Sequence, residues 1–384
     1  MSDSKIAPHS MAPLRSWLTA PMDRDVSEAL DRLRRAPDVQ QIAVMPDVHL
    51  ATDVCIGVVI ATSHLIYPQA VGGDIGCGML AVAVDLEASS LKNPKAAAQL
   101  LNELGRAIPP RRRNRDAVLT QPAELQNEPL SHPSLDASRR REGEIEFATL
   151  GSGNHFLELQ ADEEDRLWIT VHSGSRALGQ AIRDHHLARA QVVDGRFRTL
   201  DAESNAGKEY LYDAAWARRF AAASRKAIAE EAGKVLTQML KCSICWETMI
   251  TTDHNHVAHE HHGGRALWVH RKGAMHIQQG EPGVLPGSMG SPSFHVEGRG
   301  CEDALCSSAH GAGRALSRGA ARSKFSDRDL QRQMEGVWYD YRLTGKLRDE
   351  APAAYKDIRA VLKAERELVK VVRTLRPVLN YKGI

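Results

Sequence analysis

The chain has 384 residues and is 42% hydrophobic, which is enough apolar material for a large buried core in one domain or in about two or three smaller ones. Its 50 basic and 48 acidic residues leave a formal net charge of +2, which excludes binding of polyanions through overall charge and leaves only local patches for that purpose. No apolar run reaches membrane-spanning length, and residues 1–21 lack the apolar core and cleavage site of a secretory leader, so we expect a cytoplasmic protein with no membrane partner.

Three short runs of β-branched and other apolar residues occupy the first part of the chain. Residues 41–45, 57–62 and 79–84 lie beside turn-forming residues, which predicts three buried strands. Residues 91–107 carry apolar side chains at helical spacing and are predicted to form a helix.

The segment 108–145 differs in composition, because it is rich in proline, arginine, asparagine and glutamate. We interpret it as an exposed basic insertion. Its two arginine triplets, 111–113 and 139–141, could follow a nucleic-acid backbone, although charge runs in loops are more often only solvated.

The middle of the chain alternates strand and helix patterns. Residues 167–171 predict a strand that delivers His172 at its carboxyl end, followed by a helix near 181–190 and a long helix over 207–240. Residues 249–269 predict a strand, a histidine-rich turn and a second strand.

The last third begins with a tight loop at 286–290 before a strand at 294–296. His310 is predicted to lie just before a helix that runs through Arg314, Leu316 and Arg318, which would bring helix N-terminal N–H groups toward a phosphate. We expect residues 351–378 to be mostly helical. No internal repeat or break in composition marks a boundary, so we expect one compact mixed unit over residues 1–384.

The stretch 71–79 places Asp74 and Cys77 three residues apart among glycines. A carboxylate and a thiolate differ in softness, so together they suit a borderline divalent cation better than magnesium or calcium. With His155, His172 and His254 they form a five-ligand set that could hold two ions if Cys77 bridged them. Each residue taken alone is explained equally well as a small buried hydrophobe or a hydrogen-bonded turn residue, but the joint occurrence favours a metal site.

His310 stands in a Gly-Ala-Gly turn followed by Arg314, which favours a nucleophile that attacks a phosphate. The alternative is a histidine that only caps a helix.

Two other motifs carry weaker signals. Cys242 and Cys245 form an isolated C-x-x-C that we interpret as structural, and the six irregularly spaced cysteines do not predict a disulfide framework. His254-Asn255-His256 resembles the H-N-H element of some nucleases, but a match of only three residues is weak evidence.

Taken together, these motifs resemble the RtcB family of RNA ligases, which join RNA ends with GTP and manganese. The resemblance covers nearly the whole chain in family order, at residues 44–49, 74–79, 150–156, 172–176, 254–255, 271–274, 286–290, 310–314, 354–358 and 382–383.

The resemblance implies an α+β fold: a single RtcB-like domain of mixed β-sheets surrounded by helices, with the active site in a central cleft. It implies two Mn²⁺ ions, although cysteine and histidine alone would favour zinc. One ion is bound by Asp74, Cys77 and His155 and the second by Cys77, His172 and His254.

The implied reaction begins when His310 attacks the α-phosphate of GTP. The guanylate then passes to an RNA 3′-phosphate, and a 5′-hydroxyl end displaces GMP; a 2′,3′-cyclic phosphate is opened first. An archease-type activator is a further implied partner. Arg176 and Arg314 would face phosphates, and the nucleotide would be bound by Asn154, Glu158, Asn255, Ser288, His310, Gly311, Ala312, Gly313, Tyr355 and Lys382.

The chain also departs from the family pattern at three places. Residues 51–53 read Ala-Thr-Asp where Gly-Lys-Gly is common, Gly73 replaces a branched residue, and Ala309 replaces a serine before His310. Two alternatives stand beside the ligase. The same two-metal ligands could belong to a metal-dependent phosphoesterase or nuclease, and the loss of the lysine near residue 52 favours a non-catalytic RNA-binding paralogue.

Overall fold

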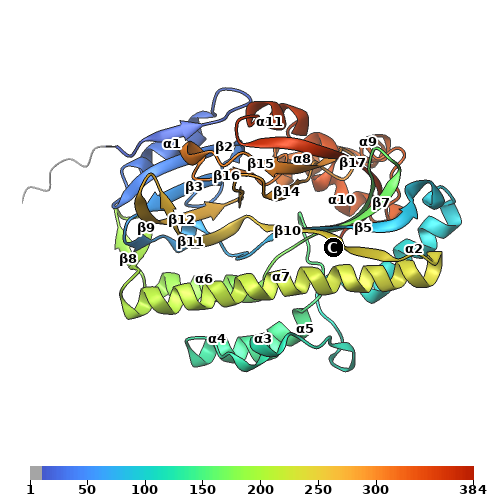
Figure 1. Cartoon of the computed structure of the whole chain (residues 1–384), viewed down its shortest axis with the longest axis horizontal. Coiled ribbons are helices and arrows are strands. Elements are labelled where there is room, and N and C mark those ends of the chain that lie inside the picture. Colours follow the sequence, from blue (N-terminus) through green and yellow to red (C-terminus); the bar gives the residue numbers. More distant parts are fainter. Residues whose placement is uncertain (1–10) are drawn as a thin grey trace, which may run out of the picture.

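The computed structural model describes residues 11–384, and the first ten residues, on which part of the leader expectation falls, lie outside them. Two large β-sheets form the centre of the molecule, and helices lie around them (Figure 1). The first sheet has five strands, with one parallel pair at its edge and antiparallel pairing elsewhere. In spatial order its strands are β1 (Leu14–Ser16), β2 (Val39–His49), β3 (Ile56–Thr62), β12 (Arg265–Lys272) and β11 (Asn255–His262).

The second sheet has seven strands, and each neighbouring pair is antiparallel. In spatial order they are β10 (Ile244–Asp253), β5 (Gly78–Glu87), β7 (Arg166–Ser173), β6 (Phe156–Ala161), β17 (Val369–Tyr381), β15 (Ser293–Gly298) and β14 (Pro282–Leu285). Two small sheets complete the strands: β13 (Ala274–His276) with β16 (Ser307–Ala309), and β4 (Leu65–Ile66), β9 (Phe197–Asp201) and β8 (Gln191–Val193).

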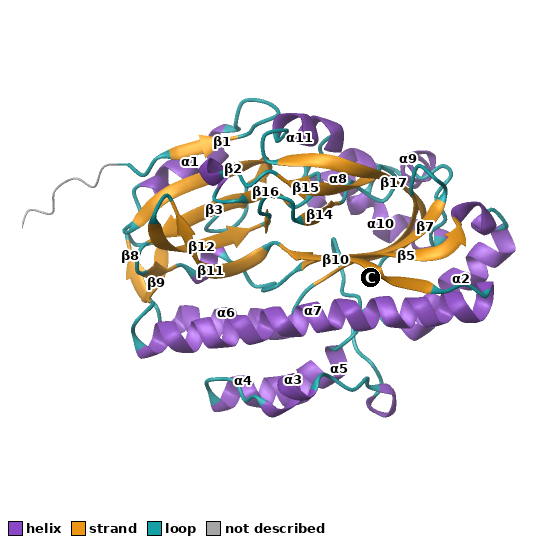
Figure 2. Ribbon diagram, viewed as in Figure 1, coloured by secondary structure: helices purple, strands orange, loops and turns teal. Residues whose placement is uncertain are grey.

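Helices cover the sheets from outside (Figure 2). The longest, α7 (Asn205–Leu240), has 36 residues and packs its apolar side on β5 and β7. Its side chains Trp216, Phe220 and Leu236 are fully buried in the main core. The other helices are α1 (Arg24–Arg34), α2 (Pro94–Ala107), α3 (Ala123–Asn127), α4 (Pro133–Ser138), α5 (Glu144–Glu146), α6 (Arg176–Arg189), α8 (Arg318–Lys324), α9 (Asp327–Gln333), α10 (Thr344–Leu347) and α11 (Ile358–Ala364).

Most predicted elements are confirmed. The runs 41–45, 57–62 and 79–84 lie within β2, β3 and β5, where nearly every side chain is buried. The helices predicted at 91–107 and 207–240 correspond to α2 and α7. The mixed α+β class is confirmed as well. Among residues 11–384, no helix combines the length and apolar character needed to cross a bilayer.

The predicted helix after His310 is wrong. Residues 310–317 are irregular, and α8 begins only at Arg318 behind the N-cap Ser317, whose hydroxyl accepts from the Ala320 N–H. Gly313 has φ +70°, and a Cβ there would lie 2.5 Å from the carbonyl oxygen of Asp47. The turn is therefore shaped by packing against β2, and the first N–H groups of α8 come eight residues after His310.

The prediction of a mostly helical tail is also wrong. Only α11 is α-helical there, and Val369–Tyr381 forms β17, an interior strand of the seven-stranded sheet. Four of its first six residues are β-branched, which favours a strand over a helix.

Two further sequence interpretations need correction. The histidine-rich turn is strand β11 up to His262, and only Gly263-Gly264 forms the turn. The segment 108–145 is not a uniformly exposed insertion, because it contains α3 and α4 and buries Leu125, Leu130 and Arg139. Arg139 donates to the carboxylate of Asp136 at 2.6 Å.

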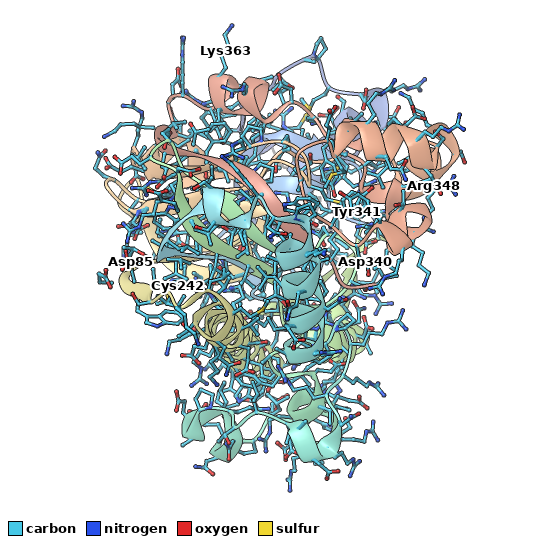
Figure 3. The ribbon with its side chains drawn as sticks, turned by 90° about the vertical axis from the view of Figure 1, so that its right-hand side faces the viewer. Asp85, Cys242, Asp340, Tyr341, Arg348 and Lys363 are labelled. Atoms are coloured by element: carbon cyan, nitrogen blue, oxygen red, sulfur yellow. The ribbon has the colours of Figure 1, made fainter. Side chains whose placement is uncertain are left out.

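Cys242 and Cys245 lie where α7 passes into β10, and the flank after them is a strand (Figure 3). Both thiols are free, and Cys242 is buried. The Asp85 N–H donates to the Ser243 carbonyl at 2.9 Å and ties this junction to β5. The pair is part of the packing at this corner of the sheet.

Candidate active site

The five predicted metal ligands meet at one edge of the seven-stranded sheet. Strands β10, β5, β7 and β6 are consecutive neighbours and antiparallel, so the end of β10, the start of β5, the end of β7 and the start of β6 lie at the same edge. His254 follows β10, Cys77 precedes β5, His172 lies near the end of β7, and His155 precedes β6. Asp74 lies in the turn before Cys77.

Cys77 lies at the centre of this cluster, in contact with histidines on both sides. Its Sγ lies 3.4 Å from Nε2 of His155 and 3.3 Å from Nε2 of His172. Asp74 Oδ2 is 2.9 Å from His155 Nε2, and His254 Nε2 is 3.4 Å from His172 Nε2. The ligand atoms thus form two groups of three, Asp74–Cys77–His155 and Cys77–His172–His254.

The protonation states of the cluster suit the binding of divalent cations. Burial and the neighbouring histidines hold the pKa values of His172 and His254 well below their usual range, so both imidazoles are neutral at pH 7 and keep a lone pair for a metal. Burial and the Asp74 charge raise the pKa of the Cys77 thiol, so a cation would have to draw off its proton. Burial opposes ionisation of Asp74, but the charge of His155 outweighs it and lowers the Asp74 pKa to about 2.

Hydrogen bonds and close packing also orient the candidate ligands for metal binding. His172 Nδ1 lies 3.1 Å from the carbonyl oxygen of Asn154, which fixes the tautomer with Nε2 free toward Cys77. A Cβ at Gly174 would lie 2.2 Å from Asp74 Oδ1, so the backbone just after β7 approaches this carboxylate as closely as only glycine allows. One oxygen, one sulfur and three nitrogen ligands in this arrangement can hold a pair of divalent cations bridged by a thiolate.

His310 lies beside this cluster and is oriented by Asp47. The Asp47 Oδ2 atom is 2.5 Å from Nδ1 of His310, and the Asp47 side chain is completely buried. The His310 ring lies 4.8 Å, centroid to centroid, from the ring of the candidate metal ligand His254. With Nδ1 directed at a carboxylate, Nε2 is the nitrogen available for chemistry.

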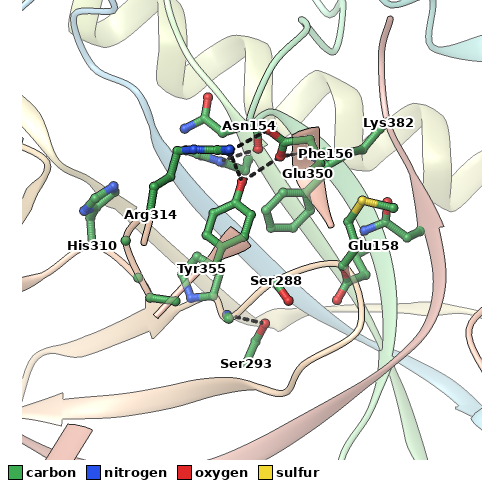
Figure 4. Close-up of a pocket in the computed structure, with 18 of the residues that line it drawn as sticks. Asn154, Phe156, Glu158, Ser288, Ser293, His310, Arg314, Glu350, Tyr355 and Lys382 are labelled. Atoms are coloured by element: carbon green, nitrogen blue, oxygen red, sulfur yellow. Dashed lines mark hydrogen bonds and ion pairs between the residues drawn. The ribbon is translucent and has the colours of Figure 1, made fainter. Parts of the chain in front are cut away.

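A cavity of about 270 Å³ opens next to His310 between the two sheets. Figure 4 shows His310 and Glu158 on opposite sides of this cavity, with Tyr355 between them. The cavity is lined by most of the residues predicted to bind the nucleotide, namely Asn154, Glu158, Ser288, His310, Gly311, Ala312, Gly313, Tyr355 and Lys382, and also by Arg314.

Glu350 holds the polar wall of the cavity together. Its carboxylate accepts from Lys382 Nζ at 2.6 Å, from the Tyr355 hydroxyl at 2.7 Å and from Arg314 at 3.2 Å. Arg318 Nη1 completes the set at 2.5 Å. Burial disfavours its charge, but the Lys382 and Arg318 charges outweigh burial and lower the Glu350 pKa to about 2. The carboxylate therefore orders four side chains that point at the cavity.

Glu158 lies at the opposite end of the cavity from His310, and within residues 11–384 its carboxylate forms no ion pair. Gln160 and Asn380 donate to its two oxygens at 2.8 and 2.6 Å. Burial raises its pKa to about 7. A ligand that offers two N–H donors could replace the proton on this carboxyl group.

Two predicted residues lie outside the cavity lining. The Asn255 amide donates to the carbonyl oxygen of Asp74 at 3.0 Å and accepts from the Gly273 N–H at 2.9 Å, so it braces the metal-binding turn. Arg176 donates to Thr149 Oγ1 and to the Pro110 carbonyl, both at 3.2 Å.

The structure adds residues that the sequence did not single out. Asp47 belongs to the motif at 44–49, but only the fold pairs it with His310. Glu350 ends the short 3-10 helix at Arg348–Glu350 and belongs to no motif, so its role appears only through its four partners. Further additions to the cavity lining are His49, Phe156, Arg318 and Asn380.

Two of the positions that depart from the family pattern, the loop at 51–53 and Gly73, pack against neighbouring elements. Lys272 Nζ donates to the Val54 carbonyl at 2.7 Å and so fastens the loop 51–54 to β12. Burial lowers the Lys272 pKa to about 8. At Gly73 a Cβ would lie 2.2 Å from the Gln180 side-chain oxygen, so the neighbouring α6 side chains fill the space of a larger residue.

Comparison with known proteins gives a consistent result over the whole chain. The family model described as tRNA-splicing ligase RtcB matches residues 29–132 and 124–383. The chain is 36% identical to the RNA-splicing ligase RtcB of Escherichia coli strain K12 over 405 aligned residues, which cover 97% of this chain and 98% of that protein. It is 29% identical to the tRNA-splicing ligase RtcB of Nanoarchaeum equitans, with 94% and 92% covered, and 29% identical to the RNA-splicing ligase RtcB of Mycobacterium tuberculosis, with 88% and 96% covered.

Proposed function

We propose that this chain, which belongs to the RtcB family of tRNA-splicing ligases, is a GTP- and Mn²⁺-dependent RNA ligase that joins 3′-phosphate or 2′,3′-cyclic phosphate ends to 5′-hydroxyl ends. The observation that carries the proposal is the position of His310. Its ring lies against the metal ligand His254, its Nδ1 faces the buried carboxylate of Asp47, and it lines a cavity whose other end holds Glu158.

The protein's own part in the first step follows from this geometry. Asp47 holds the His310 ring with Nδ1–H toward its carboxylate, so the Nε2 lone pair can attack the α-phosphorus of GTP. A phosphorus–nitrogen bond forms, the bond from the α-phosphorus to the bridging oxygen breaks, and pyrophosphate leaves. The Asp47 charge stabilises the positive charge that develops on the imidazole.

The later steps return His310 to its starting state. An oxygen of the RNA 3′-phosphate attacks the guanylate, the phosphorus–nitrogen bond breaks, and the 3′-phosphate becomes activated as a diphosphate ester of guanosine. The 5′-hydroxyl oxygen of the second end then attacks the RNA phosphorus, and GMP leaves. A cyclic phosphate must first be hydrolysed to the 3′-phosphate.

The metal ions would be held by the two groups of three ligands around Cys77. When bound, they supply Lewis-acid polarisation of the phosphate oxygens. The donor atoms also suit zinc, and manganese is proposed from the family rather than from ligand chemistry.

The remaining cavity residues suit the rest of the nucleotide. Glu158, with its two oxygens facing a buried space, could accept from the N1–H and 2-amino groups of guanine. Lys382 and Arg314, ordered by Glu350, would lie near the ribose or phosphates. Arg176 contributes positive charge near Asp74.

The structure gives the nuclease alternative little support. In the His254-Asn255-His256 stretch, His256 is turned away to Asp253 and Arg271, and Asn255 braces the metal-binding turn. A non-catalytic paralogue would have no need of the ordered Asp47–His310 pair. The need for an archease-type activator and the cytoplasmic location stay predictions.

The test is an RNA joining reaction with defined ends. With GTP and Mn²⁺, we expect the chain to join a 3′-phosphate or cyclic phosphate end to a 5′-hydroxyl end, with no product when GTP is omitted. The exposed variant Asp53→Asn should join at the wild-type rate, and His310→Ala should not join at all. Cleavage of the same RNA without joining would instead support the hydrolase, and joining of 5′-phosphate ends would overturn the proposed polarity.

A further inference from the structure

A second cluster of metal-binding side chains lies at the far end of β11 from the active site. His262 ends this strand, Glu302 opens the short 3-10 helix at Glu302–Ala304, and Cys306 precedes β16. Their ligand atoms lie within 4.8 Å of one another. β11 begins at Asn255, next to the active-site ligand His254, so its eight residues separate the two clusters by roughly 25 Å.

We propose that His262, Glu302 and Cys306 bind a third divalent cation of the zinc type, separate from the catalytic ions. The His262 Nδ1 atom lies 3.0 Å from Glu302 Oε2, and the Cys306 Sγ atom lies 3.7 Å from Glu302 Oε1. Two ligands of one tetrahedral zinc ion lie roughly 3.3 to 3.7 Å apart, given bond lengths of about 2.0 to 2.3 Å. These two pairs are close to that spacing, and the ligand atoms of His262 and Cys306 lie within 4.8 Å of each other.

The surroundings of His262 resemble those of a metal-binding histidine. Its other nitrogen, Nε2, lies 2.9 Å from Glu260 Oε2, so a carboxylate fixes the ring with Nδ1 toward the cluster. Glu260 is itself held by Arg271, whose Nη2 atom lies 2.9 Å from Glu260 Oε2. This is the carboxylate–histidine arrangement that orients a ligand and raises its basicity.

The thiol is positioned by the same arginine. Arg271 Nη2 donates to the Leu305 carbonyl at 2.8 Å, and Arg271 Nε donates to Ser307 Oγ at 2.9 Å, so both neighbours of Cys306 are tied down. Leu305 and Cys306 have φ values of +52° and +45°, a left-handed conformation that costs free energy for residues other than glycine. His262 and Cys306 are more than nine-tenths buried, whereas the Glu302 side chain is 62% exposed and leaves the ion open to solvent.

The bound ion would have a structural effect. It would link the end of β11 to the turn before β16, and β16 leads directly to His310. The competing explanation is an imidazolium at His262 that bridges Glu260 and Glu302, because these carboxylates raise its pKa. An imidazolium has no lone pair for a metal, so the two explanations exclude each other.

The test uses the full chain, stripped of metal and titrated with Co²⁺, with thiolate-to-cobalt absorption as the readout. Cys77→Ser removes the thiolate of the catalytic cluster, and we expect this variant to retain the absorption with one equivalent of Co²⁺. Adding Cys306→Ser or His262→Gln should abolish it, whereas adding Cys245→Ser should leave it unchanged. Absence of the band in Cys77→Ser, or its survival in the Cys77→Ser/Cys306→Ser protein, would overturn the site.

A second measurement, the number of zinc ions bound per chain, uses a single variant and so does not depend on the double variants folding. Metal analysis of zinc-saturated protein should show one ion fewer per chain in Cys306→Ser than in wild type, with guanylylation retained. Zinc should also raise the midpoint of thermal unfolding less in this variant. Equal zinc content in the two proteins would contradict the proposal, whether or not the catalytic site works as proposed above.

Discussion

The Asp47 Oδ2 atom lies 2.5 Å from Nδ1 of His310, and the two residues are 263 positions apart in the chain. The contact forms because β2 ends against the turn at 310–313, where a Cβ on Gly313 would lie 2.5 Å from the Asp47 carbonyl oxygen. Asp47 is completely buried, and the histidine is only 14% exposed. The pair thus resembles the acidic and histidine members of a catalytic triad, and in the proposed mechanism the histidine is the nucleophile.

Replacing Asp47 by asparagine should slow guanylylation of His310 by about a hundredfold or more. The amide keeps the shape but carries no charge to offset the positive charge that develops on the ring, and its NH2 group can donate to Nδ1 and select the tautomer whose Nε2 is protonated. The measurement is the single-turnover rate of label transfer from GTP to protein. The exposed neighbour Asp53→Asn serves as the matched control and should keep the wild-type rate. A wild-type rate in Asp47→Asn would remove the carboxylate from the mechanism.

Cys77→Ser should lower the manganese content and abolish guanylylation while leaving the fold largely intact, because Cys77 belongs to both groups of metal ligands. Metal analysis and circular dichroism of the purified variant check both parts. Cys245→Ser, a free cysteine in β10, should behave as wild type. A Cys77→Ser protein with full metal content and normal labelling would show that no thiolate bridges the ions.

Glu350→Gln should destabilise the protein by about 3 kcal/mol, because it leaves the buried Lys382 ammonium without its counter-charge. The folded-state pKa of Glu350 is lowered to about 2, so its contribution is fully present above the unfolded pKa and is lost as pH falls toward 2. Thermal unfolding at pH 7 and at pH 3 tests this, and the difference between wild type and variant should shrink at the lower pH.

The matched control for that experiment is Glu335→Gln, an exposed glutamate in the same part of the chain. Its unfolding midpoint should equal that of wild type. A Glu350→Gln protein as stable as this control at pH 7 would show that the four partners of Glu350 do not depend on its charge.

GTP should bind more weakly as pH falls below about 7, because burial raises the pKa of Glu158 to about 7 and the protonated carboxyl cannot accept both guanine donors. The sign follows from the raised pKa: the empty site holds a proton below pH 7, and GTP must displace it. Calorimetric titration between pH 6 and 8 should show proton release. Glu158→Gln should flatten this pH dependence and reduce the preference for GTP over ATP. A dissociation constant independent of pH in wild type would remove Glu158 from base recognition.

The sequence was sufficient to predict that these five candidate metal ligands lie together, because their local signals are strong. Asp74 and Cys77 stand in a glycine-rich turn, and the three histidines lie at strand ends that antiparallel pairing brings to one edge of the sheet. The buried strands were equally predictable, since runs such as 79–84 are apolar throughout.

The errors come from tertiary contacts that leave no local pattern. The residues around Arg314 suit a helix, but packing of Gly313 on Asp47 holds them in an irregular turn. The strand β17 lies between β6 and β15, and these partners are far away in the chain. Glu350 is important through four side chains that come from three separate segments, and no spacing rule indicates such a set.

The most direct test of the account is the covalent capture of a nucleotide by His310. The protein is incubated with Mn²⁺ and GTP labelled on the α-phosphate, denatured, and digested for peptide mapping. We predict acid-labile label on the peptide that contains His310, full labelling in Asp53→Asn and none in His310→Ala. Unlabelled wild-type protein with two bound metal ions, or label that persists in His310→Ala, would contradict the proposed mechanism.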